Sequence, residues 1–282
     1  MELNFQKQRI NVIDLSTLKR TFKENDVMGN PLRGMYHYDL IEKVGDILLN
    51  KGLRMQIEEI FAAQSGDKNT PSVTVSPVLA QQYGETAPEA HLLRRVYANI
   101  NVADFDNDEF TTHVAVAWHQ KGIQVAFGPT VKICHNLCIM GRGQVLTTGK
   151  DMTIERLLEK FSDLMFQLPD TVSLNRGIIE RMKGRVMSPQ EILCSIGSLT
   201  AMRVAHDTLK PEIRRQDMYP LNQAQISKFT ESLLVKQKAY SQVTAWDLYN
   251  AGTELLKPNS SDIPSLFDQH VALSEYVITN LL

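Results

Sequence analysis

The fold of this chain is decided by the stretch HVAVAWHQKGIQVAFGPTV, residues 113–131. On each side of the dipeptide Lys121-Gly122, apolar residues recur at every second position, which is the pattern of a β-strand with one buried face. A connection of two residues joins strands that are neighbours and antiparallel. The residues predicted to share the buried face are Val114, Val116, Trp118, Ile123, Val125 and Phe127.

The strand pattern continues on both sides of this hairpin. Residues 94–102, RRVYANINV, alternate in the same way and lead through the acidic connection DFDNDEF into the hairpin. After the hairpin, Gly128-Pro129 predicts a second turn, and TVKICHNLCIM, residues 130–140, predicts a further strand. Because every connection is short, these strands are predicted to form an antiparallel meander.

The segments before the meander are mixed. Residues 36–52 place apolar residues on one helical stripe and end at a glycine, Gly52, which predicts a helix that stops there. Residues 53–62 alternate and predict a strand that distorts at Glu58-Glu59. The loop that follows contains SVTVSPV, which predicts one short strand.

The second half of the chain is predicted to be helical. One helix has Ser188 as its N-cap and Glu191 at the third position, and this pair forms a capping box. The other predicted helices cover residues 152–166, 173–186, 221–237, 244–257 and 262–282. Helices that follow a meander directly usually cover one face of it. We therefore predict an α+β fold, with the meander in residues 1–150 packed against helical residues 151–282 as one compact unit.

Composition describes an ordinary globular protein. Among its 282 residues, 43% are hydrophobic and 22% are charged, and 30 basic residues face 32 acidic ones. This balance excludes duplex binding that is driven by net charge alone. No apolar run approaches the ~18 residues that cross a bilayer, and the first ten residues lack an apolar signal region. We expect a cytoplasmic protein with no membrane contact, and three reduced cysteines.

Residues 134–138 contain the residue types of a metal site or of a cysteine-nucleophile site. Cys134 and Cys138 carry thiols and His135 lies between them, and these are zinc-ligand types. In a strand, however, His135 points away from both cysteines, and the two thiols lie ~13 Å apart. The same alternation prevents Cys134 and His135 from acting as a nucleophile and its base, so a partner such as His119 would be needed. We expect no metal, no cofactor and no catalytic residue here.

Two loops resemble binding loops without matching them. GQVLTTGKD lies between a strand and a helix, but it has the wrong glycine spacing and lacks the hydroxyl residue after the lysine of a phosphate loop. DFDNDEF lacks the glycine that a calcium-binding EF-hand loop needs at its sixth position. Neither loop predicts a nucleotide or calcium site.

A basic and aromatic set around the meander is the remaining candidate. Basic side chains beside aromatic rings suit single-stranded nucleic acid, because each base offers a face for stacking. The predicted contacts to single-stranded DNA are Arg94, Arg95, Lys132, Arg142 and Lys150. The alternative interpretation is that the aromatic residues belong to the core and that these charges are ordinary surface.

Three blocks resemble an uncharacterised family of bacterial proteins that are carried on conjugative and phage-like mobile elements. The blocks are LLRRVYANIN, HQKGIQVAFG and VKICHNLCIMG, within residues 72–150. A further block, AWDLYNAGTELLKP, is similar to a signature of a broader phage- and plasmid-associated family, in which a strand ending Cys-x-Asn also recurs. The matching positions here are Trp246, Asn250, Ala251, Thr253, Glu254, Cys134 and Asn136. The resemblance implies a genomic setting and no agreed activity.

Within that resemblance, Asn136 and Asn250 are polar residues in apolar elements, and a buried amide must be hydrogen-bonded. We predict that Cys134, His135, Asn136 and Asn250 form a structural polar junction between the sheet and the C-terminal helices. The leading functional hypothesis is a protein of a mobile element that binds or anneals single-stranded DNA. One alternative is an enzyme with a site near Cys134, His135 and His119. Another is a protein-interaction or anti-defence protein, and the sequence leaves homo-oligomers open.

Overall fold

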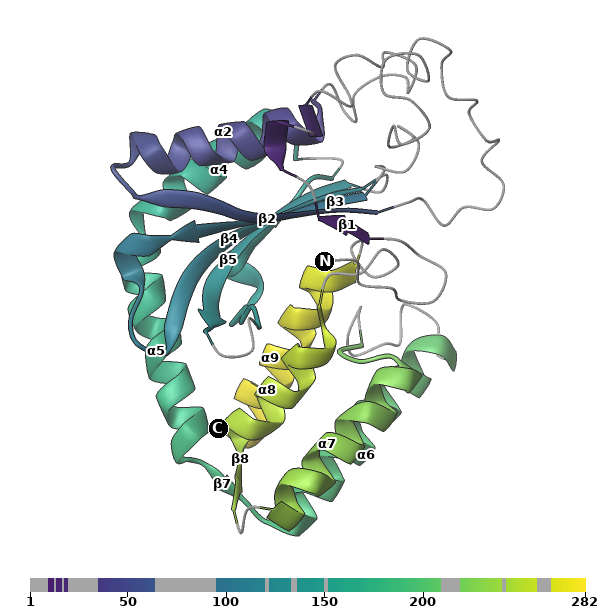
Figure 1. Cartoon of the computed structure of the whole chain (residues 1–282). Coiled ribbons are helices and arrows are strands. Elements are labelled where there is room, and N and C mark those ends of the chain that lie inside the picture. The colour runs from purple at the N-terminus through teal and green to yellow at the C-terminus, as the bar shows by residue number, and fades with distance from the viewer. Residues whose placement is uncertain are drawn as a thin grey trace.

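An antiparallel meander forms the centre of the molecule (Figure 1). The computed structural model describes residues 10–12, 14–16, 18–19, 35–63, 95–119, 122–132, 136–149, 152–208, 219–239, 242–257 and 265–282. In this part of the chain, six strands form one sheet in the order of the sequence, and each pairs antiparallel with the next. They are β1 Ile10–Val12, β2 Met55–Ala63, β3 Arg95–Val102, β4 Phe110–His119, β5 Gly122–Val131 and β6 Val145–Thr147. The predicted α+β class is confirmed.

The helix and the strand before the meander form where the sequence predicts them. Helix α2, His37–Asn50, is followed by Gly52 with φ of +76°, a left-handed conformation that glycine adopts without steric cost. In β2 the register shifts between Ile57 and Glu59, which is a β-bulge at the predicted distortion. The predicted strand in SVTVSPV lies outside the described residues.

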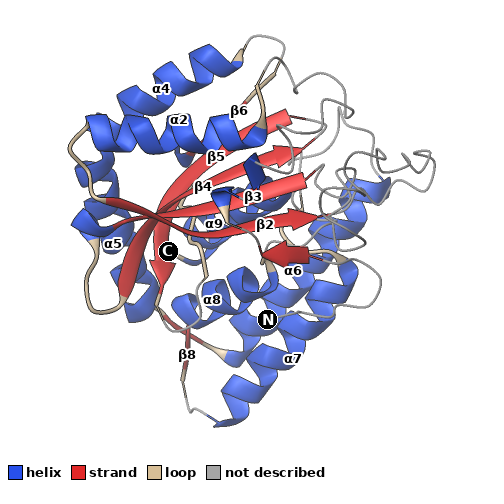
Figure 2. Ribbon diagram, turned by 45° about the horizontal axis from the view of Figure 1, so that its top comes forward, coloured by secondary structure: helices blue, strands red, loops and turns tan. Residues whose placement is uncertain are grey.

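Helices also make up most of the second half, as predicted. They are α4 Ile154–Phe166, α5 Leu168–Gly184, α6 Pro189–Thr208, α7 Gln223–Ala239, α8 Ala245–Leu255 and α9 Leu266–Leu281. Two short strands that the sequence did not predict, β7 Val186–Met187 and β8 Val243–Thr244, pair antiparallel with each other. Helices α6 and α7 lie side by side at the edge of the molecule, away from the sheet (Figures 1 and 2).

The two faces of the sheet pack against different helices. One face carries apolar side chains such as Ile100 and Phe127, which pack with α2 and α4. The opposite face carries Ala115 and Ala126 beside the aromatic Tyr97, and it packs with the C-terminal helices. Helices therefore cover both faces, whereas the sequence predicted one covered face.

Trp118 lies on the predicted buried face and packs against the core there, although it is less completely buried than Val114 and Val116. It stands next to the last residue of β4, where the sheet gives less cover, and its ring meets the ring of His37 edge-on at 5.1 Å.

The turn predicted at Gly128-Pro129 does not exist. Both residues lie inside β5, opposite His113 and Thr112 of β4. Glycine is needed at 128 because a Cβ atom there would come within 2.2 Å of the carbonyl oxygen of Cys138. Residues 136–140 contribute one isolated bridge, between Thr130 and Leu137, in place of the predicted strand. The neighbour of β5 on the side away from β4 is β6, which the sequence predicted to be part of a loop.

The close approach at Gly128 can be tested. Gly128→Ala should destabilise the protein by ~1–3 kcal/mol, because two backbone segments must move apart to admit one methyl group. The control is Gly177→Ala in α5, where no atom outside the helix backbone lies within 4 Å of the new Cβ. That change should stabilise the helix by ~0.5–1 kcal/mol. Urea unfolding of both variants measures the difference, and equal stabilities would contradict the assignment of residue 128.

Candidate functional site

The structure brings together two residues of the predicted polar junction. Asn136, with 1% of its surface exposed, donates from Nδ2 to Oδ1 of Asn250 at 3.0 Å and to its carbonyl oxygen at 3.4 Å. This contact joins the segment after β5 to helix α8. Cys134 and His135, the other members of the junction, lie outside the described residues.

The same segment has a further contact with α8 and one with α5, and neither was predicted from the sequence. The hydroxyl of Tyr249 donates to the carbonyl oxygen of Ile139 at 3.4 Å, and burial raises the pKa of this phenol. The Oε1 atom of Gln144 accepts from the backbone of Met140 at 2.8 Å, and its Nε2 donates to Asn175 of α5 at 2.7 Å. A signal was present, since Gln144 and Asn175 are amides in apolar surroundings. The segment is thus a hydrogen-bonded connector between the sheet, α5 and α8.

The predicted basic set is not brought together in the described residues. Arg95 begins β3, at the end of the sheet where β5 starts, whereas Lys132 follows the other end of β5. At 3.3 Å per residue these positions lie ~30 Å apart. Arg142 opens a short 3-10 helix and has a 64% exposed side chain, and its Nε atom lies 3.4 Å from Oε1 of Glu275. Arg94 and Lys150 lie outside the described residues.

A polar cluster that the sequence did not reveal occupies the bulge of β2. Oε2 of Glu58 lies 2.8 Å from Nε2 of His113, and Nδ1 of that ring lies 3.2 Å from the hydroxyl of Thr111. Asn101 donates to the other oxygen of Glu58 at 3.2 Å. A carboxylate, an imidazole and a hydroxyl in a row can relay a proton. The imidazole is only 2% exposed, however, so the cluster orients side chains across three strands without offering His113 to a substrate.

His119 does not join this cluster. It is six residues from His113 on the same strand, which corresponds to ~20 Å, and it is 4% exposed. Among the residues that the structure describes, no group of three or more His, Cys, Asp and Glu side chains is placed to hold a metal ion. In the same part of the chain, no helix combines the length and apolarity that a bilayer crossing needs.

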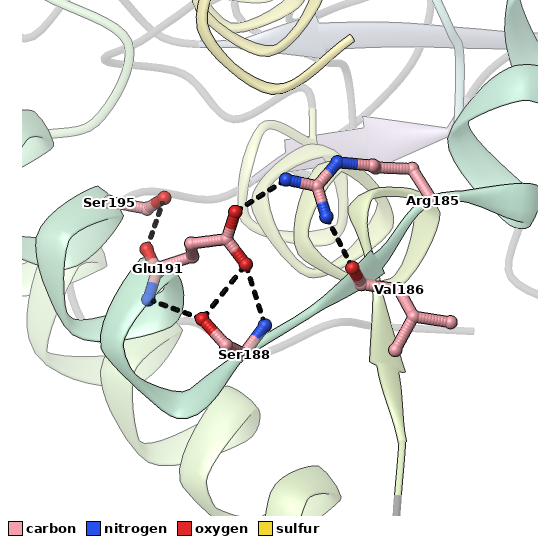
Figure 3. Close-up of polar contacts among 5 residues, drawn as sticks. All are labelled: Arg185, Val186, Ser188, Glu191 and Ser195. Carbon is pink, nitrogen blue, oxygen red and sulfur yellow. Dashed lines mark hydrogen bonds and ion pairs between the residues drawn. The ribbon is translucent and has the colours of Figure 1, made fainter.

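A network of polar contacts surrounds the start of helix α6, which we call its base (Figure 3). The predicted capping box is present: Glu191 accepts from the backbone and the hydroxyl of Ser188 at 2.7 and 2.9 Å, and its own N–H donates to that hydroxyl at 3.3 Å. Arg185 forms an ion pair with Glu191 and also donates to the carbonyl of Val186. Ser195 continues the chain of contacts by donating to the carbonyl of Glu191 at 2.8 Å.

This base is fixed to the rest of the protein at the β7–β8 pair. Val186 lies opposite Thr244, and the N–H of Ala245 donates to the carbonyl of Arg185 at 2.8 Å. Thr244 starts a second capping box, with Asp247, at the beginning of α8. Asp247 also lies 3.7 Å from the ammonium group of Lys236 in α7. We call α6 and α7 the helical arm, and both of its ends are therefore held at one point.

The face of α6 that points away from α7 is exposed and uncharged. The side buried against α7 carries Ile192, Ser195 and Leu199. The opposite side is called the neutral seam below, and its exposed residues are Leu193, Cys194, Gly197, Ser198, Ala201 and Val204. From residue 193 to residue 204 the one charged residue is Arg203, whose guanidinium lies 4.4 Å from the ring centre of Tyr219. Surface helices normally carry far more charge than this.

Helix α6 was predicted from the sequence, whereas this seam was not. Apolar residues on both sides of the helix were the available signal, because a helix that is apolar all round usually has neighbours all round. Which of the two sides meets α7 is decided by packing, which one sequence does not show.

Comparisons with known proteins supply no analogy for any of these regions. The chain matches no family model, no curated protein and no solved structure. The resemblance to mobile-element proteins therefore stays a prediction from the quoted blocks.

The base of the helical arm predicts a pH dependence. The hydrogen bonds from Ser188, followed by the contact with Arg185, lower the pKa of Glu191 from its ordinary value of 4.5 to about 2. A carboxyl whose pKa is lower in the folded state stabilises that state above its unfolded pKa, and this contribution disappears as the pH falls through the folded pKa. Glu191→Gln should therefore lower the thermal midpoint at pH 7, and the deficit should shrink between pH 4.5 and about 2.

Thermal unfolding followed by circular dichroism across this pH range is the measurement. Glu254→Gln, at an exposed carboxylate of α8, controls for the loss of one surface charge. A deficit for Glu191→Gln that stays constant over the whole range would show that the capping box does not depend on the charge of Glu191.

Proposed function

We propose that the protein is a binding module that contacts a protein partner through the neutral seam of its helical arm. One observation carries the proposal. Leu193 and Val204 are 56% and 52% exposed on a helix face whose other exposed residues, between these two, are small or weakly polar and uncharged. Contiguous exposed apolar surface on a soluble protein marks a contact site more often than chance.

The chemistry of the seam suits a helix as the contacting element. Burial of a leucine or valine side chain contributes ~1.5–3 kcal/mol, so two such residues can anchor a contact. Gly197, Ser198 and Ala201 lie between these anchors and present little bulk. Helix axes approach to within 8–10 Å depending on the side chains at the contact, and small residues allow the shorter distances.

The fixed base of the helical arm supports the same proposal. A surface that is already ordered before it binds loses little conformational entropy on binding. The capping box of Glu191, the β7–β8 pair and the ion pair between Lys236 and Asp247 all hold the helical arm in place.

Binding of single-stranded DNA stays a second proposal, and it depends on Arg142. Its side chain is 64% exposed, and a Cβ atom at Gly141 or Gly143 would meet nothing within 4 Å, which leaves room for a phosphate beside the backbone. The nearby carboxylate of Glu275 competes for the same guanidinium.

In the test of the helical arm, a photoreactive amino acid replaces Ala201 in the cells that naturally make the protein. Irradiation should give one dominant protein adduct, and Leu193→Glu should reduce its yield, because a carboxylate in the seam would lose its hydration on contact. The control places the same amino acid at Leu174, which is 65% exposed on α5 and lies outside the helical arm. If position 201 gives no adduct beyond those of position 174, the proposal is wrong.

The single-strand proposal has its own measurement. Arg142→Ala should weaken binding of a labelled oligonucleotide in an anisotropy titration at ~50 mM salt, by a similar factor for different base sequences, since phosphate contacts do not read bases. Arg156→Ala, at an exposed arginine of α4, is the matched control. Absence of binding by the unaltered protein at ~10 µM would overturn this second proposal, because even non-specific contacts reach 10⁻⁴–10⁻⁶ M at physiological salt.

A further inference from the structure

We infer that the partner of the neutral seam is the seam of a second copy of this chain, packed antiparallel across a two-fold axis. The inference rests on the proposed function, because it identifies the partner of the same surface. A two-fold contact uses one surface patch on both subunits, so the patch must be complementary to itself.

The distribution of charge favours a second seam over any other helix that the structure describes. Burial of an unpaired charge is costly, so an uncharged face binds another uncharged face more favourably than a charged one. The other long helices each expose charged residues, which would have to be desolvated against the seam. Examples are Lys43 of α2, Glu155 of α4, Glu180 of α5, Lys228 of α7, Glu254 of α8 and Asp268 of α9.

The order of residues along the seam is complementary to itself in the antiparallel direction. The two large side chains, Leu193 and Val204, stand at its ends, and the small Gly197 and Ala201 lie between them. With the axis midway between Gly197 and Ala201, each Gly197 would meet the partner subunit's Ala201, and each Leu193 would lie within one residue, ~1.5 Å along the axis, of the partner subunit's Val204. In a parallel arrangement, Leu193 would meet its own copy, and the small residues would leave a gap between two bulky contacts.

This geometry fixes distances that can be measured. At 1.5 Å per residue, the two copies of Gly197 would lie ~6 Å apart along the helix axes, whereas the two copies of Gln190 would lie ~27 Å apart. A parallel pair would bring both positions together equally. Gly197 has open space around it, so a cysteine can replace it without a clash within the chain.

The first experiment uses thiol crosslinking of the purified full chain. In a Cys194→Ser background, Gly197→Cys should be joined into a covalent dimer by a short bismaleimide, and Gln190→Cys should not. The background variant alone gives the baseline for the remaining cysteines. Equal crosslinking at both positions, or crosslinking at neither, would overturn the antiparallel seam.

The second experiment measures mass in solution. Sedimentation equilibrium should give twice 31.9 kDa, and Leu193→Glu should raise the dissociation constant by at least about tenfold, since one leucine contact is lost on each side of the axis. Leu174→Glu, at an exposed leucine outside the helical arm, should leave the constant unchanged. The thermal midpoint of Leu193→Glu, taken at a concentration where the unaltered chain is also monomeric, shows whether the monomer itself has been damaged.

The outcomes separate the two proposals. A monomer at all concentrations up to ~100 µM, or a dimer that Leu193→Glu leaves unchanged, overturns the self-association. If the photoreactive group at position 201 then labels a different protein, the binding role of the helical arm stands. If it labels nothing, both proposals fail.

Discussion

The close approach of main chain to main chain at Gly128 is the constraint on which the arrangement of the C-terminal half depends. The carbonyl of Cys138 occupies the space above this residue, and alanines continue the shallow surface along β4 and β5. Large side chains on the opposite face give α2 and α4 an apolar surface to pack on. On the face of Gly128, the connector after β5 comes close to the sheet, whereas α8 and α9 contact it through aromatic rings, Trp246 against Phe110 and Phe267 against Tyr97. The amide contact between Asn136 and Asn250 then fixes α8 in register with the connector.

The position of α8 in turn determines where the helical arm begins and ends. The start of α8 and the start of α6 meet at the β7–β8 pair, and each start is closed by its own capping box. Backbone donors at a helix start have no partner within the helix, so each box satisfies groups that would otherwise face solvent. Two helix starts at one short ladder make a compact base for the helical arm.

Local patterns could be predicted from the sequence because neighbours along the chain decide them. The capping box of Ser188 and Glu191 and the irregularity at Glu58 are examples, and so is the alternation of Val114 and Val116. What could not be predicted depends on distant contacts. The dipeptide Gly128-Pro129 is typical of a turn. The contact with the carbonyl of Cys138, which the sequence does not show, explains why a glycine lies in this strand. The same applies to the site. Asn136 and Asn250 stood out as polar residues in apolar elements, whereas the link between Glu58 and His113 depends on a register shift.

The ladder of β7 and β8 also gives the helical arm the topology of an insertion. The chain enters the helical arm after Met187 and leaves it at Val243, and these two residues are paired partners. A helical pair whose two ends are held together can change in length without moving the strands that hold it. If α6 and α7 each gained two helical turns, the end of the helical arm opposite the β7–β8 pair would lie ~11 Å further from that pair, at 1.5 Å per residue. The length of the helical arm can therefore vary without a change at the β7–β8 pair, and a designer could use the same pair of strands to hold a different pair of helices.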